Sequence, residues 1–102
     1  MTLKSKKLRN SAKGQECQVR LPGLCNYNPE TVVLAHVGKG SGMGQKADDI
    51  HAAFCCSACH DILDKRQYTP LLSYEEIENY AWHGVQRTQK IWLEMGLIEV
   101  AA

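Results

Sequence analysis

The sequence predicts a small α+β domain with a thin hydrophobic core. A chain of 102 residues has the length of one domain, and 7% aromatic residues with a single Phe leave few large side chains for its interior. One β-branched run and two helical patterns supply the strands and helices of this fold class. No apolar run reaches membrane-spanning length, and no apolar stretch follows the basic N-terminus. We therefore expect a cytoplasmic protein.

Charge is distributed unevenly along the chain. Residues 1–46 contain eight Lys and Arg against two Glu, whereas residues 47–102 contain four against nine acidic residues. Residues 1–14 predict a flexible basic arm, followed by a single domain at 15–102. Cations of this kind contact DNA phosphates without reading bases, although a solvated tail is the alternative. The candidate DNA-binding residues are Lys4, Lys6, Lys7, Arg9, Lys13, Lys39, Lys46 and Arg66.

Two pairs of cysteines predict a structural metal site. The first pair flanks a Pro-Gly turn in ECQVRLPGLCNYN, and the second has the Cys-x-x-Cys spacing that directs both sulfurs at one metal. A total of five cysteines, an odd number, in a reducing compartment disfavours a disulfide framework. The predicted zinc ligands are Cys17, Cys25, Cys56 and Cys59. Cys55 is expected to face the core as a small apolar residue.

The middle of the chain predicts two short strands separated by a loop. ETVVLAHV, residues 30–37, is the best strand candidate because β-branched residues dominate it. GKGSGMGQK after it is a glycine-rich loop, and Asp48 and Asp49 are expected to cap that loop. A second short strand or turn is expected at 51–54.

Two helices are predicted after the Cys-x-x-Cys turn. The first begins near Cys59 and ends before Thr69-Pro70. The second covers about 73–95, because Ser73 and Glu76 form a capping box and Gly96 supplies a stop. Its apolar side chains recur at three- and four-residue steps and predict a packing surface without chemistry: Ile77, Tyr80, Ala81, Val85, Thr88, Ile91, Trp92 and Met95.

Three histidines and an aspartate form a second candidate site. His36 ends the first predicted strand, His51 follows the loop, and His60 directly follows a zinc-ligand candidate. On a helix that starts near Cys59, His60 and Asp64 lie one turn apart on one face, where they can bind one divalent cation. The strand then places His36 across from this helix, where it can act as a base on water.

These residues resemble a known nuclease motif. LAHV, the glycine-rich loop and HAAFCCSACH are together similar to the His-Asn-His (HNH) endonuclease motif, in which a ββα unit surrounds one catalytic metal. The match covers about residues 17–66, and the Cys-x-x-Cys-His junction resembles the zinc-bearing branch of that family. The whole chain resembles small phage and prophage HNH-type proteins of the YbcO-like family, and the nuclease domain of the phage recombination-enhancement protein Ref. The resemblance implies a zinc-stapled ββα-metal (HNH, or His-Me finger) core at about 30–67.

By position, the resemblance makes His36 the general base, and His60 and Asp64 the ligands of a catalytic Mg²⁺ or Mn²⁺. His51 takes the central position, where most members have Asn and where the residue orients the base. Many members have Asp or His immediately before the base, but here that residue is Ala35. The implied cation then has two protein ligands, with water and phosphate oxygens completing its coordination. Asp48 and Asp49 are the alternative additional ligands, although capping the loop is the role expected first for both.

The implied activity is metal-dependent hydrolysis of DNA phosphodiester bonds in phage or prophage recombination or processing. Sequence preference is expected to be weak or directed by DNA structure, and a recombinase filament on DNA is a candidate partner. The alternative is a non-catalytic zinc-knuckle module that binds DNA or acts as an adaptor, in which His36 is itself a zinc ligand. Ala35 is the observation that favours this alternative.

Overall fold

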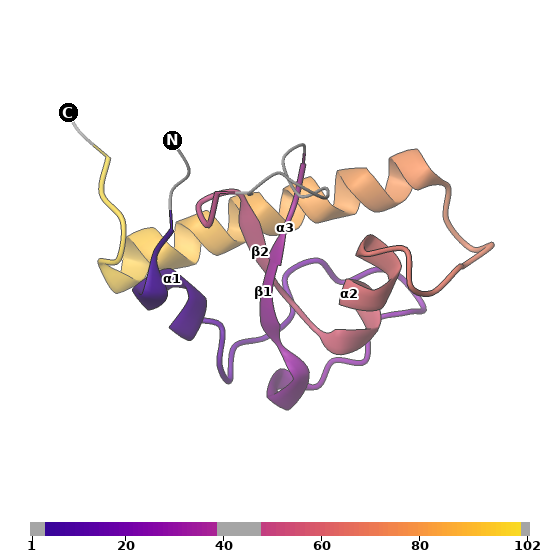
Figure 1. Ribbon diagram of the computed structural model, residues 1–102, viewed down its shortest axis with the longest axis horizontal. Coiled ribbons are helices and arrows are strands. Elements are labelled where there is room, and N and C mark those ends of the chain that lie inside the picture. Colours follow the sequence, from indigo (N-terminus) through magenta and orange to yellow (C-terminus); the bar gives the residue numbers. More distant parts are fainter. Residues whose placement is uncertain (1–3, 39–47, 101–102) are drawn as a thin grey trace.

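A computed structural model describes residues 4–38 and 48–100 of the chain. Two strands and a short helix follow one another as β1, β2 and α2, and the long helix α3 runs across the strands (Figure 1). In chain order the elements are α1 (Lys6–Asn10), the 3₁₀ turn η1 (Pro29–Thr31), β1 (Val33–His36), β2 (Ala52–Cys55), α2 (Ser57–Leu63) and α3 (Tyr74–Met95). This arrangement confirms the predicted α+β class.

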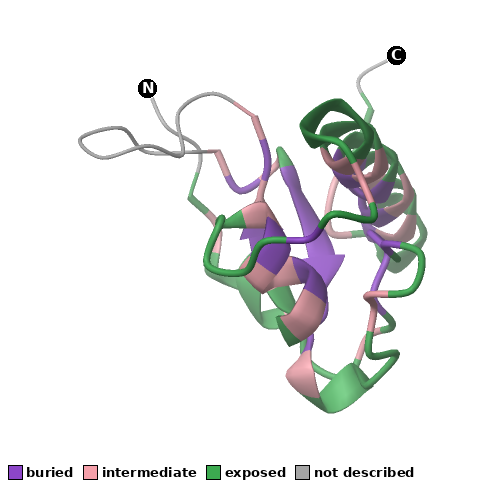
Figure 2. Ribbon diagram, turned by 90° about the vertical axis from the view of Figure 1, so that its right-hand side faces the viewer, coloured by how far each residue is buried: buried purple, intermediate pink, exposed green. Residues whose placement is uncertain are grey.

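The two strands pair antiparallel, with Val33 opposite Cys55 and His36 opposite Ala52. All four residues of β2 are buried, because α3 packs against this strand. Figure 2 shows the buried strand β2 beside α3, whose outer face is exposed. The pairing brings the end of β1 to the start of β2, so His36 lies beside the turn that leads into β2.

Helix α3 confirms the sequence prediction closely. The Ser73–Glu76 capping box is present at its N-terminus, and Gly96 ends it in the left-handed conformation at φ 75°. Trp92 is fully buried and meets the Phe54 ring edge-on, with 5.9 Å between ring centroids. Met95 differs from the predicted packing face because it is 48% exposed. The helix thus supplies the main support for β2.

The N-terminal segment differs from the flexible arm that the sequence predicted. Residues 6–10 form helix α1, whose Leu8 is buried, as is Ala12 just after it. The Trp92 indole N–H donates to the Ser11 hydroxyl at 2.8 Å, which ties this segment to α3. An apolar pair four residues apart among lysines is a weak signal in the sequence, yet it is sufficient to pack a short helix.

Helix α2 begins at Ser57, two residues before the predicted start, with Cys56 as its N-cap. It ends at Leu63, and Lys65 follows in the left-handed region at φ 60°. The predicted glycine-rich loop falls mostly in residues 39–47, so Lys39 and Lys46 lie outside the described part of the chain. Among the helices of residues 4–38 and 48–100, none has the length and apolarity needed to cross a membrane.

Candidate metal centre and active site

The four predicted zinc ligands lie together around one point. The sulfurs of Cys17, Cys25, Cys56 and Cys59 are all within 4.8 Å of one another, and the Cys25 and Cys56 sulfurs are 3.7 Å apart. Sulfurs bound tetrahedrally to zinc at about 2.3 Å are separated by about 3.8 Å. The donor set and its spacing therefore fit a structural Zn²⁺.

Backbone amides support the sulfurs of both cysteine pairs. The Arg20 N–H donates to the Cys17 sulfur at 3.5 Å, and the Cys59 N–H donates to the Cys56 sulfur at 3.4 Å. Arg20 takes the left-handed conformation at φ 51°, which folds the chain back over Cys17. Amide donors favour the thiolate forms that bind a metal.

The thiols of the cluster differ in the direction of their pKa shifts. Hydrogen bonds from the Cys55 and Cys59 thiols lower the pKa of Cys17, whereas burial raises the pKa of Cys25 to about 11. Four thiolates this close together would repel one another, and a divalent ion bound between them would offset that repulsion. Hydrogen bonds to Cys17 and Cys59, together with burial, raise the pKa of Cys55, which remains a buried thiol outside the cluster, as predicted.

The predicted pair on α2 is also brought together. The His60 Nε2 lies 3.2 Å from the Asp64 Oδ2, and the two side chains are 28% and 39% exposed. This distance is that of a direct i,i+4 contact between the two side chains, and the divalent cation expected between them stays a prediction. Arg66 also approaches the Asp64 Oδ2 at 3.5 Å. In the described residues, the histidines and carboxylates form no second cluster of three or more potential ligands.

The His36 ring contacts Asp49, a residue that was expected from the sequence to cap the loop. The Asp49 Oδ1 lies 2.7 Å from the His36 Nε2, and the Asp49 side chain is only 4% exposed. Its Oδ2 accepts from the Ser5 N–H at 2.6 Å and pairs with the Arg9 Nε at 3.3 Å. Burial would raise the pKa of Asp49, but these donors, with His36, hold it below its ordinary value of 3.8.

The sequence predicted that Asp49 caps the loop, but this residue also contacts His36. The sequence offered only a faint signal, a pair of acidic residues between a glycine-rich loop and a buried strand. Its separation from His36, at 13 positions, corresponds to no local spacing rule. The contact depends on the antiparallel pairing of β1 with β2, which brings the two chain segments together.

His51 lies immediately before β2, and its surroundings differ from those of His36 and His60. Its carbonyl oxygen accepts from the Val37 N–H at 2.9 Å, so its backbone extends the pairing of β1 with β2. Its exposed ring lies edge-on to Trp82, with 6.2 Å between ring centroids. The expected role of His51 in orienting the base stays a prediction.

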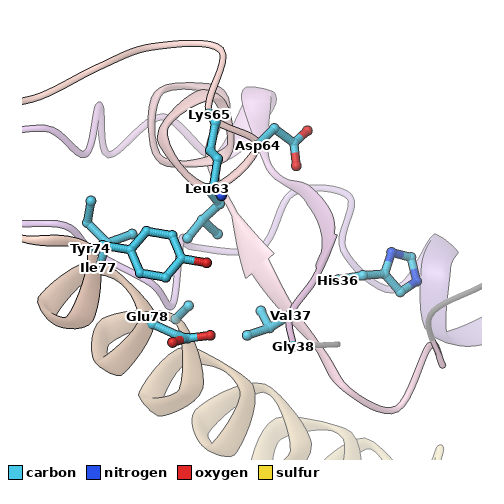
Figure 3. A pocket seen from close by; sticks show the side chains of 10 residues that line it. His36, Val37, Gly38, Leu63, Asp64, Lys65, Tyr74, Ile77 and Glu78 are labelled. Atoms are coloured by element: carbon cyan, nitrogen blue, oxygen red, sulfur yellow. The ribbon is translucent and has the colours of Figure 1, made fainter. Parts of the chain in front are cut away.

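A pocket of about 180 Å³ lies between the end of β1, the end of α2 and the start of α3. In Figure 3, the His36 ring points away from the other labelled side chains of the lining, and the Asp64 carboxylate points away from Tyr74. Lys65, which the sequence had not singled out, also lines the pocket, and its ammonium lies 4.8 Å from the centre of the Tyr74 ring. The candidate base and one candidate cation ligand thus border a common space.

The basic candidates on the described N-terminal segment are on the surface. Lys4, Lys6, Lys7, Arg9 and Lys13 are all on the outside of the fold, as is Arg66 after α2. The contacts of Ser5 and Arg9 with Asp49 place α1 near His36. The N-terminal cations therefore belong to the segment that contacts Asp49, the partner of His36, whereas Arg66 lies beside Asp64.

Comparison with known proteins gives a consistent result. The family model described as "Putative nuclease YbcO" matches residues 6–97. The chain belongs to this family. It is 48% identical to "Putative nuclease YbcO" of Escherichia coli (strain K12) and to "Putative nuclease ybcO" of Enterobacteria phage 82. Each match spans 94 residues, which are 90% of this chain and 96% of the relative.

A solved structure has the same fold. It is the "Structure of a putative bacteriophage protein from Escherichia coli str. K-12 substr. MG1655", with a TM-score of 0.74 and 47% sequence identity. The match covers 88% of this chain and 100% of that one. Membership of a family that occurs in both a phage and a bacterium confirms the coarser part of the sequence-based resemblance.

Proposed function

We propose that this chain is a metal-dependent DNA endonuclease of the HNH type that acts in phage or prophage DNA recombination or processing. The observation that carries the proposal is the placement of its histidines on a β–β–α unit. His36 ends β1, His60 lies on the helix that follows β2, and its partner Asp64 is the C-cap of that helix. The names of the YbcO relatives also support a nuclease.

The chemistry follows from the residues around the pocket. His36 accepts a proton from a water molecule, whose oxygen attacks phosphorus as the bond to the 3′ oxygen breaks. His60 and Asp64 would hold Mg²⁺ or Mn²⁺, which when bound stabilises negative charge on the phosphate and the leaving oxygen. The products are a 5′-phosphate and a 3′-hydroxyl. The family pattern implies that His51 orients the base.

DNA would be held through its backbone. The exposed cations on α1, together with Arg66 and with Lys39 and Lys46 of the glycine-rich loop, are suited to phosphates rather than to base edges. This predicts weak sequence preference, with DNA structure or a recombinase filament directing the site of cleavage. The zinc cluster has a different task in this proposal, since it fixes the start of α2.

The test is cleavage of linear, circular and single-stranded DNA by zinc-loaded protein, with and without added Mg²⁺ or Mn²⁺. His36→Ala should lower the rate by about 10²- to 10⁴-fold, while His83→Ala, an exposed histidine on α3, should leave it unchanged. Cleavage that survives His36→Ala, or that needs no added cation, contradicts the mechanism. The substrates should include DNA coated with a recombinase, and absence of cleavage on every form rejects the nuclease.

One observation favours the alternative of a non-catalytic DNA-binding module. The residue before His36 is Ala35, which is buried at 1% exposure and supplies no ligand. In that case the protein should bind DNA and contain zinc, yet show no cleavage and no binding of Mn²⁺. Metal titration of the zinc-loaded protein therefore separates the two functions even before a substrate is known.

A further inference from the structure

The two oxygens of the Asp49 carboxylate have different partners. Oδ1 contacts the His36 Nε2 at 2.7 Å. Oδ2 accepts from the Ser5 N–H at 2.6 Å and pairs with the Arg9 Nε at 3.3 Å. The carboxylate therefore joins the candidate base to the N-terminal segment, with one oxygen for each.

An ionised carboxylate only accepts hydrogen bonds. Asp49 is 3% exposed, and a buried carboxylate stays ionised where several donors surround it, as Ser5, Arg9 and His36 do here. The nitrogen that faces its Oδ1 must then carry a proton. In a neutral imidazole the other nitrogen, Nδ1, has the free lone pair.

We infer that Asp49 is a positioning residue that fixes His36 in the Nε2–H tautomer, so that Nδ1 is the atom that accepts a proton. The catalytic consequence rests on the proposed nuclease function, whereas the tautomer does not. The N-terminal segment acts through the same carboxylate, because Ser5 and Arg9 hold it in place. This gives α1 a part in orienting the base, in addition to its cations.

Asp49→Asn separates positioning from simple anchoring. The amide replaces one carboxylate oxygen by an NH₂ group, which only donates. Two donors, from Ser5 and Arg9, converge on the Oδ2 position, so the amide oxygen should take that position and the NH₂ should face His36. The His36 Nε2 must then accept, which moves the proton to Nδ1 and removes the lone pair that the reaction uses.

The experiment is long-range ¹H–¹⁵N correlation NMR of ¹⁵N-labelled, zinc-loaded protein, at a pH where the imidazole is neutral. Wild-type His36 should show a protonated Nε2 and an unprotonated Nδ1, and Asp49→Asn should show the reverse. With a cleavable substrate, Asp49→Asn should also lower kcat by about 10²-fold or more with little change in KM.

Ser11→Ala is the matched control, because it removes the contact between the N-terminal segment and Trp92 without touching Asp49. It should lower the melting temperature and leave the His36 tautomer unchanged. An Nδ1–H tautomer in the wild-type protein, which needs no variant to detect, overturns the inference. An unchanged tautomer in folded Asp49→Asn does so too. The predicted tautomers in a protein that cleaves no DNA would support the positioning role and reject the nuclease.

Discussion

The cysteine cluster and the histidine side of the molecule are neighbours in sequence, yet the fold encloses them to different degrees. Cys56 and Cys59 are 0% exposed, whereas the side chains of His36 and His60 are 31% and 28% exposed. Four sulfurs converge on one point, but the histidines have one carboxylate partner each. The chain passes from one environment to the other at the Cys59–His60 peptide bond.

The proposed function requires this difference, since one site would be structural and the other catalytic. A structural zinc site is closed by four protein ligands, while a catalytic site leaves positions for water and substrate. The cysteines can supply a complete tetrahedron. In the proposed nuclease, His60 and Asp64 would supply two ligands, and Asp64 borders a pocket that would leave room for phosphate oxygens.

The largest expected effect concerns the cysteine cluster. Cys56→Ala should release the zinc and unfold the protein, because metal binding of this kind supplies of order ten kcal/mol in zinc-finger peptides. Cys55→Ala, at the adjacent buried position, should retain the zinc and reduce the free energy of unfolding by only about 1–3 kcal/mol. Zinc content and circular dichroism measure both outcomes. A folded, metal-free Cys56→Ala protein would show that the core alone is sufficient.

The two sites also differ in how far the sequence could predict them. Spacing alone predicted the four cysteines, because a Cys-x-x-Cys turn and a second pair leave few alternatives in a small domain. The i,i+4 rule predicted the His60–Asp64 pair in the same way. The Asp49–His36 contact is different, because it depends on strand pairing across a loop and on the packing of α1. Contacts of that kind have no signature in the local sequence.

The second test concerns the packing of α1. It decides whether the N-terminal segment is part of the site around His36. Leu8→Ala should destabilise the fold by about 2–5 kcal/mol because Leu8 is 3% exposed. Leu71→Ala is the matched control, and at 64% exposure it should cost about 0.5 kcal/mol or less. Urea unfolding compares the two variants. Equal effects would restore the flexible arm that the sequence predicted.

The third test separates the cation ligand from its neighbours on the same helix. Asp64→Asn should raise the Mn²⁺ concentration needed for half-maximal cleavage by about tenfold or more. Asp61→Asn is the control, since Asp61 is half exposed and pairs only loosely with Arg66, at 4.0 Å. Identical metal dependence in the two variants would show that Asp64 does not bind the cation, so that His60 would be the one remaining candidate ligand of the pair.

The smallest expected effect concerns DNA binding by the lysines of α1. Lys6→Gln with Lys7→Gln should reduce the slope of log K against log salt by roughly 0.9 for each duplex phosphate that these lysines neutralise in the wild-type complex. Both residues lie on the surface of α1, and the hydrogen bond from Ser5 to Asp49 places that helix near His36. Lys90→Gln, exposed on α3, should leave the slope unchanged. Fluorescence anisotropy at several salt concentrations, without Mg²⁺ or Mn²⁺, measures this directly. An equal change per lysine replaced would mean that the cations act through net charge, whereas an effect confined to α1 would place the DNA backbone beside the candidate base.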